Sequence, residues 1–425
     1  MNIRLTPAKL HGTLPAISSK SDAHRVLIAS ALAEKPTKML CNIVSDDIHA
    51  TAACLAALGA KAEFSDGVIT VYPNACETPK DVSLDCGESG STLRFLLPLV
   101  SALGKNGTFI GHGRLPNRPV TPLREAMEAH GVRFPQKEQF PLKTEGQLSA
   151  GEYTLRGDVS SQYITGLLFS LPLLEKDSTL TLLPPVESLP YIRMTLHTLR
   201  VFGIEIEETE QGFVIPGKQH FRSPGEITVE GDWSNAAFFL VAGALGDSVT
   251  VTGLRQDSEQ GDKAIVRLLS EMGAKVEIRG DAVTVSPAEL HGIPIDGANT
   301  PDLVPVLSVA AAAAKSGVTV ISNAARLRLK ECDRLSAVND CLTKLGAAVS
   351  ETDDGLVIWG GDPLHGGQVS SYNDHRMAMA TAVASIAADG PVVIHDAQAV
   401  KKSYPHFFED FNILGGKADV LNSDG

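Results

Sequence analysis

The sequence has little of several features that mark whole classes of protein. Aromatic residues make up 5% of its 425 residues, and its six cysteines form no C-x-x-C pair. Six cysteines in a chain this long are too sparse for a disulfide framework, so we expect reduced thiols. No apolar run reaches the ~18 residues that a membrane-spanning helix needs. The first seven residues lack a basic segment followed by an apolar one, so we expect no secretion signal and a cytoplasmic protein.

Positive charge is also scarce. The chain has 37 Lys and Arg residues but 50 Asp and Glu residues, which gives a net charge of -13. Proteins that bind nucleic acids need a basic face for the phosphates, so this balance argues against a nucleic-acid partner. It argues equally against binding to an anionic membrane surface. Any anionic ligand must therefore be held by a local cluster of Lys and Arg, which can focus potential in a cleft despite the global sign.

A repeat runs through the whole chain. Apolar residues at helical spacing are followed by a glycine and then by an alternating segment such as Val276–Ile278. Each glycine is expected where the end of a helix needs a left-handed residue. The glycines recur at intervals of about 70 residues, which is typical of a structural repeat. They are Gly59, Gly131, Gly203, Gly273, Gly346 and, in a degenerate copy, Gly415.

A second set of positions with the same period marks the expected helix starts. These residues have side chains that cap helix N-termini well, and Pro301 is expected at a first helical position. They are Ser21, Ser91, Ser161, Ser234, Thr300 and Asp374. Six units, each with two helices and several strands, fill the chain up to a short frayed tail after Lys417. The long period and the hairpins exclude a TIM barrel and a solenoid, and favour two three-fold domains. The pattern does not show where the chain crosses between them.

The candidates for chemistry lie mostly at these helix starts, where free N–H groups and the helix dipole favour anions. Taken singly, most of them are explained equally well by capping, turns or solvated charge. Taken together, they place about eight cations at equivalent points of a repeating fold in an acidic protein. His375 and Arg376 are informative because cations in a first helical turn oppose the dipole unless an anion is present. The segments are 18–25, 87–94, 113–120, 157–162, 188–191, 230–234, 300–302, 326–334, 372–376 and 401–402.

An ordered set of short motifs connects these segments to a known family. The motifs are Ser19-Lys20-Ser21 with Arg25, Gly90 with Arg94, Arg118-Pro119, Ser160-Ser161-Gln162, Lys330-Glu331 with Arg334, Asn373-Asp374-His375-Arg376, and Lys402. In this order the chain resembles the 5-enolpyruvylshikimate-3-phosphate synthase family over nearly its full length. The resemblance implies an α/β fold of two domains, each with three βαβαββ units around a pseudo-three-fold axis, an inside-out α/β barrel. It also implies a domain of residues 1–18 and 230–425, an inserted domain of residues 19–229, and an active site in the cleft between them.

The same resemblance implies a reaction without a metal or cofactor. The enolpyruvyl group of phosphoenolpyruvate would pass to the 5-hydroxyl of shikimate 3-phosphate by addition and elimination. Independently of the resemblance, the six-fold repetition, in which each domain has its own core, predicts a monomer. The implied catalytic residues are Lys20, Asp302, Lys330, Glu331 and His375. Shikimate 3-phosphate would contact Lys20, Ser21, Arg25, Ser160, Ser161, Gln162, Ser188, Tyr191, Asp302, Arg326 and Lys330. Phosphoenolpyruvate would contact Lys20, Gly90, Arg94, Arg118, Gln162, Arg334, Arg376 and Lys402.

In this scheme Glu331 handles the proton at C3 of phosphoenolpyruvate, while Asp302 and Lys330 address the reacting hydroxyl. Crowding by neighbouring cations is expected to lower the pKa of Lys330. Two positions depart from the family pattern. Position 88 is Glu where many relatives have Asn, so its carboxylate must point away from an anion site or pair with an Arg. Position 326 is Arg where some relatives have Asn.

Three other functions remain open at this point. The sister enzyme that transfers enolpyruvyl to UDP-N-acetylglucosamine shares the fold, but it carries a cysteine in the loop that matches Gly111 to Pro119, and this chain has none there. An RNA 3'-phosphate cyclase has a related repeat but needs a nucleotide, for which no motif is evident. A non-catalytic protein that binds phosphorylated metabolites would bind both ligands without turnover.

Overall fold

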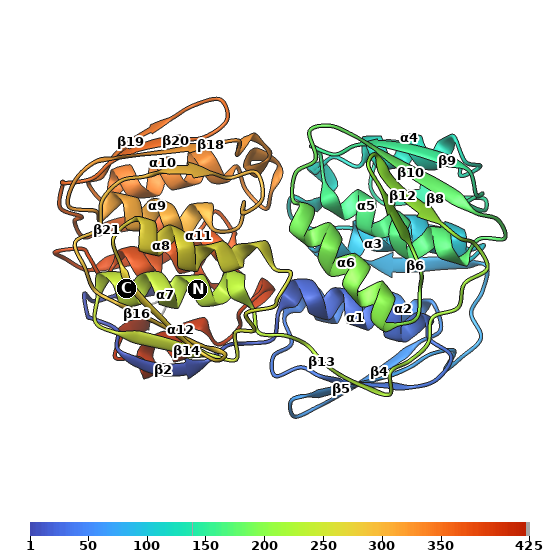
Figure 1. The fold of residues 1–425 in the computed structure, drawn as a ribbon, viewed down its shortest axis with the longest axis horizontal. Coiled ribbons are helices and arrows are strands. Elements are labelled where there is room, and N and C mark those ends of the chain that lie inside the picture. Colours follow the sequence, from blue (N-terminus) through green and yellow to red (C-terminus); the bar gives the residue numbers. More distant parts are fainter. Residues whose placement is uncertain (138, 422–425) are drawn as a thin grey trace. The chain divides into compact units, whose positions relative to one another are not determined.

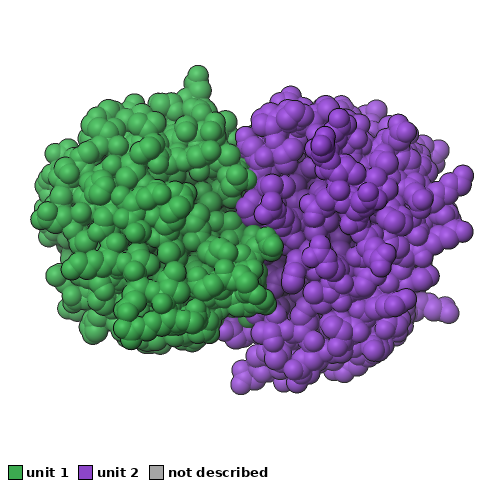
Figure 2. Space-filling model, viewed as in Figure 1, with its two compact units in different colours: residues 1–19, 230–425 green, residues 20–229 purple. Residues whose placement is uncertain are grey.

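The chain divides into two compact units in the computed structural model, which describes residues 1–137 and 139–421. Unit 1 contains Met1–Ser19 and Glu230–Gly425, and unit 2 contains Lys20–Val229 (Figure 2). The two connections lie side by side, because the Ser19 N–H donates to the Glu230 carbonyl at 2.8 Å and Ser18 forms an antiparallel bridge with Gly231. Unit 2 is therefore an insertion between two adjacent segments of unit 1.

Each unit is built from three sheets within the described residues. The sheets of unit 1 have the orders β21-β22-β1-β23, β15-β16-β14-β2 and β17-β18-β20-β19, and those of unit 2 have the orders β11-β12-β10-β9, β13-β3-β5-β4 and β6-β7-β8. The strands of unit 1 are β1 (Asn2–Leu5), β2 (Gly12–Pro15), β14 (Val249–Thr252), β15 (Lys275–Arg279), β16 (Ala282–Ser286), β17 (Pro294–Asp296), β18 (Val318–Ser322), β19 (Ala348–Glu351), β20 (Leu356–Trp359), β21 (Gly367–Ser370), β22 (Val392–His395) and β23 (Ala418–Leu421). The strands of unit 2 are β3 (Thr37–Leu40), β4 (Lys61–Ser65), β5 (Val68–Tyr72), β6 (Asp81–Asp85), β7 (Asn106–Ile110), β8 (Leu142–Thr144), β9 (Glu152–Arg156), β10 (Ser178–Leu183), β11 (Glu207–Thr209), β12 (Gly212–Ile215) and β13 (Glu226–Thr228).

The sheets share one pairing pattern. A parallel pair, such as β17 with β18, continues into antiparallel neighbours, here β20 and then β19. The same pattern holds for β9, β10, β12 and β11. The three-stranded sheet has a parallel pair and one antiparallel strand, β8. A parallel pair needs a crossover connection, and a helix supplies it, as α9 does between β17 and β18.

Three sheets contain a strand from a distant part of the chain, which the 70-residue period does not reveal. Strand β2 near the N-terminus pairs with β14, and β13 at the end of unit 2 pairs with β3. Strand β1 lies between β22 and β23 and pairs with both in antiparallel fashion. The expected frayed tail after Lys417 is therefore wrong for Ala418–Leu421, since these residues form β23; residues 422–425 lie outside the described part of the chain.

Helices fill the interior of each unit and the sheets lie around them (Figure 1). The helices of unit 1 are α7 (Trp233–Leu245), α8 (Ile265–Glu271), α9 (Val304–Ala312), α10 (Arg334–Lys344), α11 (His375–Ala384) and α12 (Phe407–Ile413), with short 3-10 helices η3 (Gly261–Ala264), η4 (Ala325–Leu329) and η5 (Ala397–Lys402). Those of unit 2 are α1 (Lys20–Leu32), α2 (Asp46–Ala57), α3 (Gly90–Ala102), α4 (Thr121–Glu128), α5 (Ser161–Ser170) and α6 (Leu189–Val201), with η1 (Leu115–Asn117) and η2 (Leu171–Leu173). Every residue of α9 and α11 is buried; α9 is apolar on nearly all sides, whereas α11 also buries His375 and Arg376. Strands such as β5 and β16 alternate between buried and partly exposed residues.

The glycine prediction is confirmed at all six helix ends. The six glycines have φ angles between 77° and 102°, a region that is strained for residues with a Cβ atom. Gly415, the degenerate copy, follows α12 with a φ of 94°. This agreement shows that the repeat detected in the sequence is a repeat of helix ends.

The predicted caps are less accurate, because the capping residue must have an extended backbone and a side chain that reaches back to a free N–H group. Asp374 caps α11 as predicted, and its carboxylate accepts from the Arg376 N–H. Elsewhere the cap precedes the predicted residue: Ser89 caps α3, Ser160 caps α5 and Asp232 caps α7. Ser21 lies inside α1, which begins at Lys20, and Thr300 and Pro301 precede α9, which begins at Val304.

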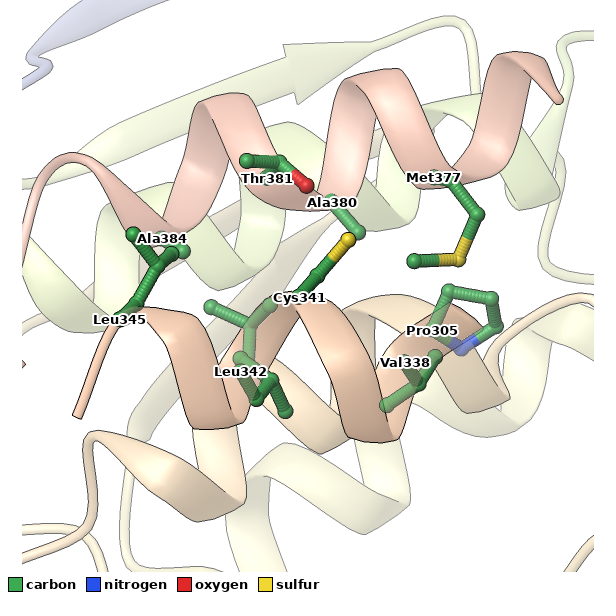
Figure 3. Close-up of a pocket in the computed structure, with 10 residues that line it drawn as sticks. Pro305, Val338, Cys341, Leu342, Leu345, Met377, Ala380, Thr381 and Ala384 are labelled. Carbon is green, nitrogen blue, oxygen red and sulfur yellow. The ribbon is translucent and has the colours of Figure 1, made fainter. Parts of the chain in front are cut away.

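A small apolar cavity lies among α9, α10 and α11 of unit 1 (Figure 3). Its free volume of about 10 Å³ is close to that of one water-sized sphere. A water molecule needs two or more polar partners, and this lining is almost wholly apolar, so we expect the cavity to be dry. The lining residues are Pro305, Val309, Val338, Cys341, Leu342, Leu345, Met377, Ala380, Thr381 and Ala384.

The absence of disulfides and of membrane-spanning helices can be checked directly in this fold. All six cysteines are free, and all except Cys76 are buried. In residues 1–137 and 139–421, no helix is both long enough and apolar enough to cross a bilayer.

Candidate active site

Arg334 is the centre of a buried charge cluster in unit 1. Its side chain is 2% exposed and forms ion pairs with Asp302 at 2.8 Å, Glu331 at 2.9 Å and Asp374 at 2.8 Å. Burial by itself lowers the pKa of Arg334, but the three carboxylates outweigh it and raise the pKa well above its usual value. Because a buried charge is tolerated only when it is paired and hydrogen-bonded, this cluster fixes the position of all four side chains.

Asp302 joins Arg334 to a second buried arginine. One carboxylate oxygen accepts from Arg334, and the other accepts from Arg376 Nη2 at 2.9 Å. Asp302 lies in the turn before α9, whereas Arg376 lies in the first turn of α11. Two helix starts that are 74 residues apart in the sequence are thereby held together.

The Arg376 cation in the first turn of α11 is balanced by carboxylates of the protein. Asp374 caps the helix by accepting from the Arg376 N–H at 2.8 Å, and its side chain is fully buried. The Nδ1 atom of His375 lies 3.8 Å from an Asp374 oxygen. The anion that the sequence pattern demands at this helix start is therefore present in the form of Asp302 and Asp374.

Lys330 and Glu331 lie in the turn between η4 and α10. The pKa of Lys330 is lowered to about 8, chiefly by burial; Asp302 acts in the opposite direction, and Arg334 lowers it further. The predicted direction is therefore right, but removal from water, more than crowding by cations, is the main cause. Arg326, in η4, donates from Nη2 to the Ala298 carbonyl.

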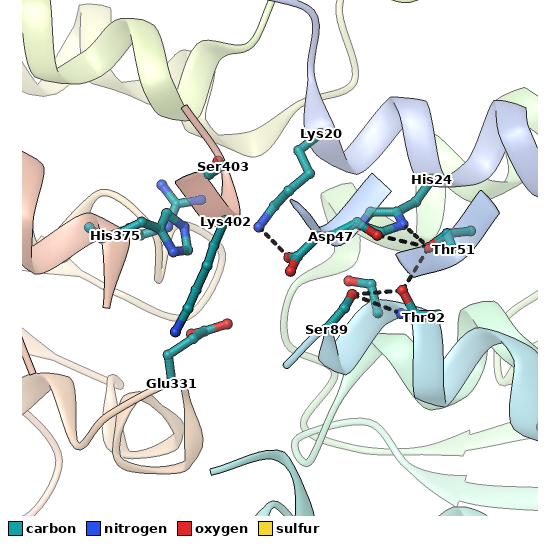
Figure 4. Close-up of polar contacts among 12 residues, drawn as sticks. Lys20, His24, Asp47, Thr51, Ser89, Thr92, Glu331, His375, Lys402 and Ser403 are labelled. Carbon is teal, nitrogen blue, oxygen red and sulfur yellow. Dashed lines mark hydrogen bonds and ion pairs between the residues drawn. The ribbon is translucent and has the colours of Figure 1, made fainter. Parts of the chain in front are cut away.

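Lys402 ends η5 and lies near the start of α11. Its Nζ atom donates to the Asn373 carbonyl at 2.6 Å. Asn373 has a φ angle of 55°, so this carbonyl belongs to a left-handed turn just before the capping residue Asp374. Glu331, His375 and Lys402 of unit 1 are drawn in Figure 4. Of the site residues predicted in this unit, Asp302, Lys330, Glu331, Arg334, His375 and Arg376 thus lie on turns and helix starts, whereas Arg326 and Lys402 lie in the 3-10 helices η4 and η5.

Unit 2 has a second cluster, which begins at Lys20. The Lys20 Nζ atom forms an ion pair with Asp47 at 2.8 Å, and the two side chains are 15% and 12% exposed (Figure 4). One turn further along α1, His24 Nδ1 lies 2.8 Å from the hydroxyl of Thr51 on α2. The hydroxyl of Thr51 in turn contacts that of Thr92 at 2.6 Å. Helices α1, α2 and α3 are therefore joined by polar contacts about one helical turn from the lysine.

Arg25 is buried between α1 and α6. Its guanidinium donates to the Thr195 hydroxyl at 2.9 Å and to the Ser21 and Tyr191 carbonyls at 2.5 and 3.0 Å. It also lies over the Phe95 ring, 5.2 Å from the centroid. Burial lowers the pKa of Arg25 to about 10, so the side chain remains charged at neutral pH. Ser188, the residue before α6, has a left-handed φ angle of 55°.

Arg94 and Gln162 connect α3 to α5. Arg94 Nη1 donates to the Gln162 side-chain oxygen at 2.6 Å, and the Gln162 amide donates to the Ser91 hydroxyl at 2.9 Å. Arg94 Nη2 also donates to the Pro119 carbonyl at 3.1 Å. At the start of α5 the Ser160 hydroxyl accepts from the Gln162 N–H at 3.3 Å, and Ser161 opens the helix.

Arg118 lies against the backbone at the start of α3. A Cβ atom added to Gly90 would stand 2.7 Å from Arg118 Nη1, so only glycine leaves room for the guanidinium there. The carboxylate of Glu88 lies beside Gly113, where an added Cβ atom would collide with it. The sequence therefore brings the site residues predicted in unit 2 to the starts of α1, α3, α5 and α6 and to the loop around Arg118.

Several residues of these clusters were missed by the sequence analysis. Asp47 and the buried Asp262 of η3 were not considered, and Asp374 was considered as a cap and as part of the motif from Asn373 to Arg376, but not as a partner of Arg334. Asp47 is the second acid in the first turn of α2, where the helix dipole alone explains an acid. Its pairing with Lys20 joins residues 27 positions apart on different helices, and no local pattern in a single sequence reports such a pair.

Comparison with known proteins identifies the family. The family model described as EPSP synthase (3-phosphoshikimate 1-carboxyvinyltransferase) matches residues 5–411. The chain belongs to the EPSP synthase family. Among curated members, the 3-phosphoshikimate 1-carboxyvinyltransferase of Clostridium novyi is 41% identical over 432 residues, with 98% of each chain covered. The protein of the same name from Clostridium kluyveri is 42% identical over 419 residues, again with 98% of each chain covered.

Two solved structures share the fold described above. EPSP synthase from Acinetobacter baumannii matches 99% of this chain and 100% of its own, with a TM-score of 0.81 and 26% identity. The enolpyruvyl transferase NikO from Streptomyces tendae matches 98% of each chain with a TM-score of 0.78, and its 18% identity bears on the fold alone. The predicted α/β fold of the enolpyruvyl transferases is confirmed.

Proposed function

We propose that the protein transfers the enolpyruvyl group of phosphoenolpyruvate to the 5-hydroxyl of shikimate 3-phosphate and releases phosphate. The family match over residues 5–411 and the full-length curated relatives support this reaction. The structural observation that carries it is the placement of Lys330 and Glu331 beside a buried Arg334 cluster, in a protein whose net charge is -13. Such a site suits an anionic substrate that must gain and lose a proton.

The chemistry fits the residues of the Arg334 cluster. In the addition step C3 of phosphoenolpyruvate gains a proton, and C2 forms a bond to the oxygen of the 5-hydroxyl, which loses its proton. In the elimination step C3 loses a proton, the bond from C2 to the phosphate oxygen breaks, and phosphate leaves. We assign the proton at C3 to Glu331 and the hydroxyl proton to the Lys330–Asp302 pair. The carboxylates also stabilise the positive charge that develops at C2.

The carboxylate of phosphoenolpyruvate is assigned to Arg334, Arg376 and His375, with Arg94 in support. A guanidinium has five N–H donors in a planar fork, so an arginine that already binds carboxylates of the protein can also donate to the substrate carboxylate; Arg334 binds three such carboxylates and Arg376 binds Asp302. The phosphate of phosphoenolpyruvate is assigned to Lys20, Arg118 and Lys402. Gly90 leaves room for the Arg118 guanidinium to lie against the backbone at the start of α3.

Shikimate 3-phosphate is assigned to the helix starts of α1, α5 and α6. Ser160, Ser161 and Gln162 present hydroxyl, amide and backbone donors at the start of α5, where the dipole favours a phosphate group. Arg25 supplies a charge that its burial does not remove at neutral pH. The remaining assigned contacts are Lys20, Ser21, Ser188, Tyr191, Asp302, Arg326 and Lys330. Because each unit contains its own helices and sheets, we also propose that the protein acts as a monomer.

A phosphate-release assay tests the reaction. The protein is mixed with phosphoenolpyruvate and shikimate 3-phosphate in the presence of a chelator, and we expect stoichiometric phosphate release. Release with UDP-N-acetylglucosamine in place of shikimate 3-phosphate would instead identify the sister activity. Binding of both ligands without release from either mixture would identify a non-catalytic binder.

The residue roles are tested by Lys20→Met and Glu331→Ala, each of which we expect to reduce turnover by at least ~10²-fold, the scale of a lost acid–base or electrostatic group. The matched controls are Lys38→Met and Glu226→Ala, which change the two members of an exposed ion pair with side chains 50% and 55% exposed. The controls should keep wild-type turnover. Near-normal rates in both site variants would refute these assignments.

A further inference from the structure

Asp262 is a buried carboxyl group that the proposed mechanism does not use. It lies in η3 of unit 1 and is 2% exposed. Its Oδ2 atom accepts from the Ser234 hydroxyl on α7, and its Oδ1 atom is buried without a hydrogen-bond partner in the described residues. A buried carboxylate with one oxygen unsatisfied is costly, whereas the neutral acid leaves a much smaller demand unmet.

The surroundings of Asp262 connect it to the proposed carboxylate-binding arginine. Asp302, from the turn before α9, and Arg376, from α11, both act on it electrostatically, as does Asp232 at the N-cap of α7. The adjacent Lys263 directs its Nζ atom to the Gln256 and Ser258 carbonyls. The pKa of Asp262 is raised to about 7, chiefly by burial; Asp302 and Asp232 also raise it, whereas Arg376 and the Ser234 hydrogen bond act in the opposite direction.

We propose that Asp262 is a positioning residue that tunes the Asp302–Arg376 pair, so that phosphoenolpyruvate binds less tightly when Asp262 carries a negative charge. The proposal rests on the assigned function, because it takes Arg376 as a ligand of the substrate carboxylate. When Asp262 is protonated, Arg376 faces Asp302 and the substrate carboxylate. When Asp262 is ionised, its negative charge competes with Asp302 and the substrate carboxylate for the Arg376 guanidinium. It also repels the substrate carboxylate, and this repulsion is strong in a site of low dielectric constant.

The sign of the pH dependence follows from this arrangement. A group with a raised pKa is still protonated at pH 6 and becomes ionised as the pH passes about 7. The KM for phosphoenolpyruvate should therefore rise between pH 6 and pH 8, whereas kcat should change less. Ionisation of the substrate phosphate, with a second pKa near ~6, affects the wild type and its variants alike, so the comparison between them isolates the protein group.

The experiment measures the KM for phosphoenolpyruvate at saturating shikimate 3-phosphate from pH 6 to pH 8.5. We expect Asp262→Asn to match the wild type at pH 6 and to have a KM about fivefold lower at pH 8, since it cannot gain the charge. In Ser234→Ala, the loss of the hydrogen bond that favours the ionised form should move the wild-type rise to higher pH. The control Asp257→Asn changes a nearby acid that is 73% exposed and should keep the wild-type profile.

A profile of Asp262→Asn parallel to that of the wild type would overturn the proposal, because a purely structural role changes KM or kcat at every pH. If Asp262→Asn fails to fold, the shift in Ser234→Ala decides the matter, and an unshifted rise counts against the proposal. Failure of the assigned function looks different, since the wild type itself would then release no phosphate at any pH.

Discussion

At the scale of single residues, the negative charge around each buried cation decides whether its pKa is raised or lowered. Arg334 is surrounded by three carboxylates, whereas Arg25 is held by a hydroxyl and two carbonyls. The pKa of the first is raised and that of the second is lowered, because only the first has enough negative charge to offset its burial. Lys330 lies between these cases, since its neighbours include both signs and its pKa falls to about 8.

The lowered pKa gives Lys330 a neutral fraction of about one tenth at pH 7, which suits proton transfer. We expect Lys330→Arg to keep the positive charge but to reduce kcat by at least ~10²-fold, because a guanidinium does not release its proton in this pH range. The KM values for both substrates should change much less. Steady-state kinetics at pH 7 and pH 9 check this. A Lys330→Arg enzyme with near-normal kcat would show that a positive charge at this position is sufficient for turnover and that proton transfer by Lys330 is not needed.

At the scale of elements, the starts of helices organise both clusters. Asp374 shows how this works, because the same carboxylate caps α11 and binds Arg334. At the start of α3, Ser89 caps the helix and Gly90 leaves room for Arg118. A helix start therefore contributes to these clusters in two ways. Its dipole favours anions, and its capping residues and glycines determine where side chains from other elements can lie.

Gly90→Ala tests this packing. The added methyl group would stand 2.7 Å from Arg118 Nη1, so the guanidinium must move from its place at the start of α3. We expect the KM for phosphoenolpyruvate to rise by about tenfold or more, the cost of one misplaced charge-assisted hydrogen bond, with a smaller effect on kcat.

A double-mutant cycle shows whether the change acts through Arg118. In an Arg118→Met background the methyl group has no guanidinium to displace, so Gly90→Ala should add little to the KM. Independent, additive effects of the two substitutions would mean that the alanine perturbs the site by another route.

At the scale of the whole molecule, global and local charge have opposite signs. The net charge of -13 repels anionic metabolites at long range, whereas the lysines and arginines at the helix starts attract them at short range. The salt dependence of substrate binding shows whether the long-range repulsion or the short-range attraction dominates. Exposed charges further apart than about 8–10 Å are screened at physiological ionic strength.

We expect the KM for both substrates to rise when ionic strength is increased from about 20 to 200 mM, because the local attraction in the clusters weakens. Steady-state kinetics in a chloride salt measure this. If the global repulsion dominated, the same salt would lower both KM values. A neutral osmolyte at matched osmolality serves as the control for effects of the solute itself.

Much of the architecture was predictable because it is local. The six glycines at helix ends follow from the left-handed φ angle that a chain needs to leave a helix, and each is visible as a glycine after an apolar run. The caps were predicted less well, since Ser89 and Ser91, or Ser160 and Ser161, are chemically equivalent in the sequence and only the backbone geometry selects one of them. The origin of β2 and β13 in distant parts of the chain was not predictable, because strand pairing leaves no local mark.

The sequence alone determined the period of the fold, the helix ends and the set of candidate residues, because helix geometry and residue chemistry are properties of short segments. The tertiary structure decided which of those residues face one another: Lys20 with Asp47, Arg334 with three acids, and Asp262 with Ser234. These pairings set the electrostatic surroundings of each group, and they depend on burial and on distances between helices that arise only when the whole unit packs.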